Sequence, residues 1–88
     1  MTDAESIAQR LRQTRLALGF KSHGEFIKGL PIRYNTYSGW ESGHPQRRLT
    51  LEGALLLCQA HDISLDWLYF GKIGGLHASL ADKLRNAT

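Results

Sequence analysis

The chain has 88 residues, which is enough for one small domain with a single hydrophobic core. Its hydrophobic content of 42%, with charges scattered along the sequence, is typical of a globular protein and excludes a disordered one. No run approaches the roughly 20 apolar residues that a membrane span needs, and the single cysteine, Cys58, excludes an intrachain disulfide. We therefore expect a cytoplasmic domain without a signal peptide, a transmembrane helix or a membrane partner.

The formal net charge of +3 is distributed unevenly. Residues 1–48 carry eight Lys and Arg against four Asp and Glu, whereas residues 49–88 carry three against four. A basic first half suits contact with a polyanion such as nucleic acid, although the same balance also serves solubility. Charge alone leaves both interpretations open.

The first predicted helix begins at the capping box Thr2-x-x-Glu5 and ends before Gly19. Its apolar residues recur at helical spacing on one side: Ile7, Ala8, Leu11 and Leu18. Arg10 and Arg12 are expected on the outer side of this helix.

Two short helices joined by a tight corner are predicted over residues 22–43. The capping box Ser22-x-x-Glu25 opens the first, and Gly43 closes the second. The residues expected inward follow i, i+3/i+4 spacing: Phe26, Leu30, Tyr37 and Trp40. The outward face of the second helix is small, polar and almost free of acid: Arg33, Tyr34, Asn35, Ser38, Gly39 and Ser42. Such a face suits a helix that contacts a partner.

A fourth helix is predicted from the N-cap Thr50 to about His61, and a short fifth helix over Leu65–Phe70, between the cap Ser64 and the stop Gly71. The side chains expected inward are Leu51, Ala54, Leu55, Leu57, Cys58, Trp67, Leu68 and Phe70. The last three of these are expected to close the core against the first helix.

Cys58 and His61, with Asp62 beside them, come closest to the pattern of a metal site. A structural zinc site takes about four convergent ligands, and no second cluster has a suitable spacing. No nucleophile with its base, no phosphate-cradling loop and no pair of catalytic acids can be assembled either. We therefore expect no metal, no cofactor and no enzymatic activity.

Residues 72–88 form a tail after the domain of residues 1–71. Gly74-Gly75 predicts a hinge. Three leucines then recur every four residues, as in a short amphipathic helix: Leu76, Leu80 and Leu84. A helix this short is unstable alone, so its apolar side must pack on its own domain or on the same helix of a second subunit.

Five pieces of sequence occur in a characteristic order and spacing: Arg10-Leu11-Arg12 with Arg15, the helix pair of residues 22–43, Trp40-Glu41-Ser42-Gly43, Thr50-Leu51-Glu52 and Ser64-Leu65-Asp66-Trp67-Leu68. From about Ile7 to Gly71 the chain therefore resembles the lambda-repressor/Cro-type (XRE) family of helix-turn-helix DNA-binding domains. The resemblance implies an all-α fold, a five-helix lambda-repressor-like domain, here with an additional short C-terminal helix. It also implies a structural ion pair between Arg15 and Glu41.

The corner between the two helices of residues 22–43 departs from the family pattern. Pro31 stands where the family usually has glycine, Ile27 stands where it usually has a small residue, and Lys21 resembles a one-residue insertion. We expect Gly29 to end the first helix of the pair early and Pro31 to be the first residue of the second. The register of the recognition helix is thereby left open by about one residue.

If the second helix of the pair lies in the major groove, its N-terminal outward residues meet base edges. Asn35 matches adenine N6 and N7, Arg33 matches guanine O6 and N7 or a phosphate, and Ser38 matches either base or backbone. Tyr34 is suited to a thymine methyl group or a phosphate. Gly39 reads nothing, but it allows the helix to approach the DNA closely.

Residues on both sides of this helix are expected to contact phosphates. His23, at the start of the preceding helix, stands where the family places a phosphate contact, which a helix N-terminus favours. Ser42 and His44 follow the recognition helix, and Arg47 and Arg48 are the best candidates for contacts that release counterions.

These expectations describe a sequence-specific DNA-binding transcriptional regulator, a repressor that covers a palindromic operator in double-stranded DNA as a homodimer. Because repressors of this type usually act as two-fold dimers, we expect the leucines of the tail to form the dimer interface: Leu76, Leu80 and Leu84. Two alternatives stay open. The chain could be an antitoxin-type autorepressor that binds a toxin, or a protein-interaction module that has lost DNA reading.

Overall fold

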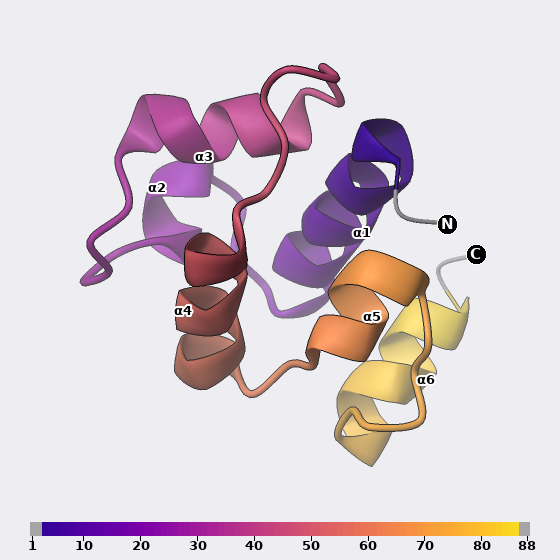
Figure 1. The fold of residues 1–88 in the computed structure, drawn as a ribbon. Coiled ribbons are helices and arrows are strands. Elements are labelled where there is room, and N and C mark those ends of the chain that lie inside the picture. Colours follow the sequence, from indigo (N-terminus) through magenta and orange to yellow (C-terminus); the bar gives the residue numbers. More distant parts are fainter. Residues whose placement is uncertain (1–2, 87–88) are drawn as a thin grey trace.

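A computed structural model describes residues 3–86, and within this range the chain forms six α-helices and no strand (Figure 1). The helices are α1 (Ala4–Ala17), α2 (His23–Phe26), α3 (Tyr34–Glu41), α4 (Leu51–His61), α5 (Leu65–Phe70) and α6 (Ala78–Asn86). The prediction of an all-helical domain is confirmed. Every segment predicted to be helical contains a helix.

Side-chain hydrogen bonds cap the starts of three helices, α2, α4 and α5. The hydroxyls of Ser22, Thr50 and Ser64 each accept a hydrogen bond from the backbone N–H three residues later, at 3.0–3.2 Å. Each bond satisfies one of the N–H groups that a helix N-terminus leaves without an intrahelical partner. The N-cap of α1 is Asp3. The predicted cap Thr2 lies outside the described residues.

The long helix α1 packs against α3, α5 and α6 (Figure 1). Helices α2 and α3 occupy one end of the molecule and α6 the opposite end. The largest side chains of the core are completely or almost completely buried: Tyr37, Phe26, Leu11, Leu57, Leu68 and Leu84. One core therefore holds all six helices together.

The corner between α2 and α3 differs from the prediction. Gly29 adopts a positive φ of 82°, as expected for a residue that turns the chain after α2. However, α3 begins at Tyr34 with Arg33 as its N-cap, so the prediction that Pro31 is the first residue of α3 is wrong. Leu30 and Ile32 both pack against the core, and the N–H of Ile32 donates to the carbonyl oxygen of Leu30 at 2.8 Å, so the proline is the middle residue of a tight turn that precedes α3.

Helix α4 is rotated relative to the prediction. Leu51 and Leu55, expected inward, are 60% and 44% exposed. Ala54 and Leu57 are buried as predicted, and Gly53 stands beside them on the buried side in place of Leu51 and Leu55. The reason is the ring of Trp40, which lies so close to Gly53 that a Cβ atom there would come within 2.2 Å of it. Because only glycine admits this contact, it decides which side of α4 faces the core.

The end of α5 brings two further corrections. Phe70 was expected in the core, but it is 55% exposed, because Trp67 and Leu68 occupy the side of α5 that faces the core. Arg10 was expected to point outward, yet its guanidinium donates hydrogen bonds of 2.9 Å to the carbonyl oxygens of Leu68 and Tyr69. These carbonyls belong to the last turn of α5, where a helix leaves acceptors without intrahelical donors. Partial burial lowers the pKa of Arg10.

Helix α6 packs against α1, and its apolar side belongs to the same core as the rest of the domain. Leu80 and Leu84 are only 4% and 1% exposed, and Leu76 is half-buried against the core. The prediction that these leucines form a dimer interface is therefore wrong for Leu80 and Leu84, which are already covered by their own chain. Within residues 3–86, no helix is both long and apolar enough to span a lipid bilayer.

Candidate nucleic-acid interface

The outward face of α3 is the polar surface that was expected from the sequence to contact a partner. Arg33, Tyr34 and Asn35 are all exposed at the N-terminal end of the helix, with Tyr34 at 57%. On the opposite side, Tyr37 and Trp40 are buried, as predicted. The helix therefore presents a polar side to the surroundings and an aromatic side to the core.

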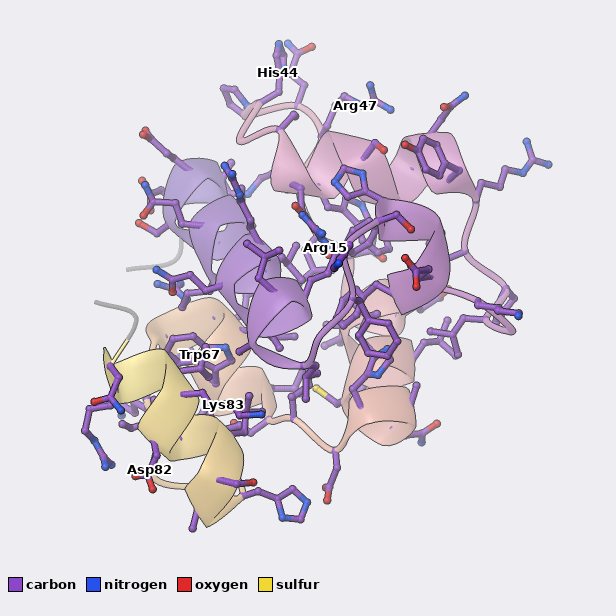
Figure 2. The ribbon with its side chains drawn as sticks, turned by 180° about the vertical axis from the view of Figure 1, so that it is seen from behind. Arg15, His44, Arg47, Trp67, Asp82 and Lys83 are labelled. Carbon is purple, nitrogen blue, oxygen red and sulfur yellow. The ribbon has the colours of Figure 1, made fainter. Side chains whose placement is uncertain are left out.

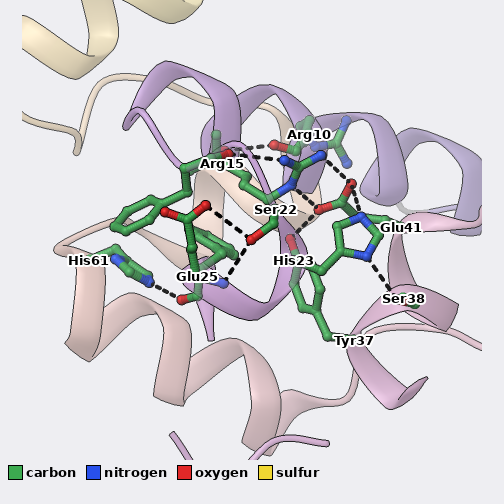
Figure 3. A network of polar contacts seen from close by, with 12 residues as sticks. Arg10, Arg15, Ser22, His23, Glu25, Tyr37, Ser38, Glu41 and His61 are labelled. Atoms are coloured by element: carbon green, nitrogen blue, oxygen red, sulfur yellow. Dashed lines mark hydrogen bonds and ion pairs between the residues drawn. The ribbon is translucent and has the colours of Figure 1, made fainter. Parts of the chain in front are cut away.

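A buried ion pair fixes α3 to α1. The guanidinium of Arg15 donates to both carboxylate oxygens of Glu41, with Nε–Oε2 at 2.8 Å and Nη2–Oε1 at 3.2 Å (Figure 3). The two side chains are only 7% and 5% exposed. The third guanidinium nitrogen donates to the carbonyl oxygen of Phe20 at 3.0 Å. The predicted pair between Arg15 and Glu41 is confirmed, in the two-bond geometry that makes arginine–carboxylate pairs specific in orientation.

Tyr37 completes this network from within α3. Its hydroxyl donates to Oε2 of Glu41 at 2.5 Å (Figure 3). Burial, together with this hydrogen bond, raises the pKa of Tyr37 far above its ordinary value. The hydrogen bond to Glu41 also raises the pKa of Arg15. Both donors stay protonated, and among the described residues no buried side-chain nitrogen or oxygen lacks a hydrogen-bond partner.

His23 lies between the ion pair and the outer face of α3. Its Nε2 is 3.3 Å from Oε1 of Glu41, and its Nδ1 is 2.7 Å from the hydroxyl oxygen of Ser38 (Figure 3). Nε2 thus faces the carboxylate of Glu41 and Nδ1 pairs with the hydroxyl of Ser38, and the tautomer of the ring sets the direction of the bond to Ser38. Both ring nitrogens are thus engaged within the protein. In this arrangement the imidazole is a positioning group for Ser38, and the contact of His23 with a phosphate stays a prediction.

The loop after α3 is held in shape by the residues predicted to contact phosphate. The hydroxyl of Ser42 donates to the carbonyl oxygen of Gly39 at 2.5 Å and accepts from the N–H of His44 at 3.2 Å. His44 in turn accepts from the N–H of Gln46 through Nδ1, at 3.1 Å. Both predicted contact residues are exposed, and both also build the turn that leads to Arg47.

Arg47 folds back onto α3. Its Nη2 donates to the carbonyl oxygen of Asn35 at 2.8 Å. A Cβ atom built on Gly39 would lie 2.4 Å from Nε of Arg47 and 2.7 Å from its Cζ. Gly39 is buried for this reason, so in this structure the guanidinium of Arg47 covers the position at which Gly39 was expected to let the helix approach the DNA closely. Figure 2 shows His44 and Arg47 at the end of the molecule that carries α3, opposite Asp82 and Lys83 of α6.

An open hollow of about 370 Å³ lies between α1, α2 and α3 beside this face. Its lining residues are Arg12, Arg15, His23, Ser38, Glu41 and Ser42. Arg12 is exposed here; it was expected on the outer side of α1 but was not among the residues predicted to contact DNA. The signal was its spacing: Arg12 and Arg15 stand at i, i+3, so they share a side of the helix that packs on α3. Arg48 is exposed in the loop after Arg47.

Among residues 3–86 no group of three or more His, Cys, Asp or Glu side chains could hold a metal ion. Comparisons with protein-family models, with curated proteins and with solved structures gave no match.

Proposed function

We propose that this chain is a sequence-specific DNA-binding transcriptional regulator of the lambda-repressor/Cro (XRE) type, with α3 as its recognition helix. The observation that carries the proposal is the exposed polar face of α3, on a helix that the buried Arg15–Glu41 pair holds in a single orientation. Base reading needs side chains placed within a fraction of an ångström, and a two-bond ion pair supplies that rigidity.

The exposed residues of α3 have the chemistry for the major groove. This groove admits an α-helix, and the side chains near the helix N-terminus then meet base edges. Asn35 offers the amide that pairs with adenine N6 and N7, and Arg33 offers the fork that pairs with guanine O6 and N7. Tyr34, exposed beside them, suits a thymine methyl group or a phosphate oxygen.

Positive charge surrounds the same face. Arg12 borders it from α1, and Arg47 and Arg48 border it from the loop after α3. Each cation that neutralises a phosphate releases condensed counterions, which makes affinity fall as salt rises. The basic half of the chain, residues 1–48, is thus the half that contains α3 and its flanking loop.

In this proposal the protein acts as a repressor in the cytoplasm by covering an operator so that polymerase cannot use it. A palindromic operator requires two copies related by a two-fold axis, with half-sites about one DNA turn apart. Since the leucines of α6 are buried in their own chain, such a dimer uses another surface.

The test is a selection of bound sequences from random duplex DNA at two salt concentrations, with Asn35→Ala as the matched control. We expect the parent chain to enrich one motif, and its affinity to fall steeply as salt rises. Asn35→Ala is expected to lose the preference at one position while keeping non-specific binding. Absence of enrichment at both salt concentrations refutes the proposal.

A second candidate, a protein-interaction module, is favoured by one observation. Leu51 and Leu55 lie one turn apart on α4 and are 60% and 44% exposed. Side chains of this kind are common in contact surfaces between proteins. The same selection separates the two candidates, because a module that binds only protein enriches no DNA sequence.

A further inference from the structure

We infer that Arg47 contacts a DNA base from the middle of the recognition helix. Gly39, which has no side chain, leaves the space in which the guanidinium of Arg47 lies against the helix backbone. This inference rests on the proposed function and deepens it. From the sequence, Arg47 was expected to contact a phosphate as part of a basic loop. The contacts of its side chain assign it to α3 instead.

The position of Gly39 on the helix is the first step. Successive residues of an α-helix are turned by about 100°, so residues four apart lie on nearly the same side. Asn35 and Gly39 therefore share the outward side of α3, while Tyr37 and Trp40 occupy the buried side. Glycine leaves this central stretch of the reading face without a side chain of its own.

Arg47 supplies the missing side chain from outside the helix. Three guanidinium atoms, Nε, Cζ and Nη2, lie 2.4, 2.7 and 2.9 Å from the place that a Cβ atom on Gly39 would occupy. The Nη2 group also donates to the carbonyl oxygen of Asn35. Only glycine at this position allows a guanidinium to rest directly on the helix backbone.

The backbone of Arg47 is fixed by the loop that follows α3. Gly43, with a positive φ of 79°, turns the chain back at the end of α3. The N–H of Arg47 then donates to the carbonyl oxygen of His44 at 3.0 Å. Arg47 is thus held at its backbone and at its guanidinium, so little freedom is left to lose when it binds.

The remaining donors of Arg47 have the chemistry of guanine recognition. A guanidinium carries five N–H donors, and the contact with Asn35 uses one of them. In the part of the chain that the structure describes, no acidic side chain forms an ion pair with Arg47, in contrast to Arg15. A planar fork of this kind matches guanine O6 and N7 with two bonds. We therefore assign to Arg47 a guanine close to the base that Asn35 reads.

The test is the substitution Gly39→Ala, which displaces Arg47 without removing it. The added Cβ would collide with the guanidinium, the far end of a flexible side chain, so the helix itself can stay in place. Alanine also has a higher helix propensity than glycine, and the unfolding midpoint is expected not to fall. In the duplex selection, we expect discrimination for guanine at one position to drop roughly ten- to a hundredfold. Discrimination at the position read by Asn35 is expected to persist.

A double-mutant cycle and two further variants check this result. Arg47→Ala is expected to lose the same discrimination, and adding it to Gly39→Ala is expected to cause no further loss, because both changes remove one contact. Arg47→Lys is expected to lose the preference as well, since lysine lacks the planar fork. Arg48→Ala is the control from the same loop, and it is expected to weaken binding to all sequences alike.

Three outcomes overturn the inference. If Gly39→Ala tightens binding to every sequence, Arg47 shields the helix and must move away before DNA binds. If Gly39→Ala and Arg47→Ala weaken all sequences equally, Arg47 contacts phosphate, and DNA binding itself still stands. If the parent chain enriches no sequence at all, the proposed function fails, and the assignment of Arg47 fails with it.

Discussion

Helices α3 and α6 were both expected to present a side to a partner, and the structure treats them differently. The polar side of α3 stays exposed, with Arg33, Tyr34 and Asn35 on the surface. The apolar side of α6 is covered by α1, and Leu84 is 1% exposed. An amphipathic pattern states which side of a helix avoids water; it does not state whose surface covers that side.

The physical reason lies in what each side gains from burial. Burying a leucine side chain is favourable by about 1.5–3 kcal/mol against any apolar surface, including the chain's own. A polar group gains nothing from burial unless a hydrogen-bond partner is supplied. The stripe of α6 therefore takes the nearest apolar surface, which is α1, whereas the outer residues of α3 remain in contact with water.

The largest expected effect tests the buried pair that holds α3. Glu41→Ala leaves Arg15 buried without its carboxylate and also removes the acceptor of the Tyr37 hydroxyl. We expect the free energy of unfolding to fall by about 3–5 kcal/mol in urea denaturation. Glu52→Ala, at an exposed position on α4, is the control. A loss below about 1 kcal/mol would show that the pair does not fix α3.

The next prediction tests the burial of α6 in its own domain. Leu84→Ala leaves a cavity beside α1 and is expected to lower the free energy of unfolding by about 2–5 kcal/mol. Leu51→Ala, at a 60% exposed position, is expected to change it by less than about 0.5 kcal/mol. The oligomeric state, measured by light scattering, should be the same for both. Loss of a dimer without loss of stability in Leu84→Ala would return α6 to the role of an interface.

A smaller effect concerns the inner side of α3 and depends on pH. Tyr37→Phe removes a hydrogen bond to a charged carboxylate and is expected to lower the free energy of unfolding by about 1.5–3 kcal/mol near neutral pH. Because burial raises the pKa of Tyr37 above the ordinary value of 10.0, only the unfolded chain ionises there. The parent protein should therefore lose stability as pH rises above about 10, from linkage. Urea denaturation at pH 8 and pH 10.5 should show a smaller alkaline loss in Tyr37→Phe; equal losses contradict the assignment to Tyr37.

The smallest expected effect on stability belongs to the outer side of α3. Asn35→Ala removes an exposed side chain and should change the free energy of unfolding by less than about 0.5 kcal/mol. On the selected DNA site it is expected to cost about 1–3 kcal/mol of binding free energy, measured by titration against a site with the adenine replaced. A large loss of stability would show that the Asn35 side chain supports the fold and does not serve only for DNA contact.

The candidate site was predictable in part. The outward residues Arg33, Tyr34 and Asn35 follow from helical spacing, and the family resemblance implied the pair of Arg15 and Glu41, which are 26 positions apart. The roles of His23 and Arg47 were not predictable. Both depend on which atoms of α3 come within hydrogen-bond distance after packing, and spacing along the sequence does not report that distance.

The sequence by itself determined where α2, α4 and α5 begin, because their caps Ser22, Thr50 and Ser64 depend on atoms only a few residues apart. It did not determine the start of α3, which has no side-chain cap and begins only at Tyr34. The tertiary structure decided which side of each helix is covered. Trp40 lies against Gly53 and rotates Leu51 and Leu55 outward. The same holds for Arg47 on Gly39 and for the stripe of α6 on α1. These contacts join residues far apart in the chain, and their free energies exist only once the helices have packed together.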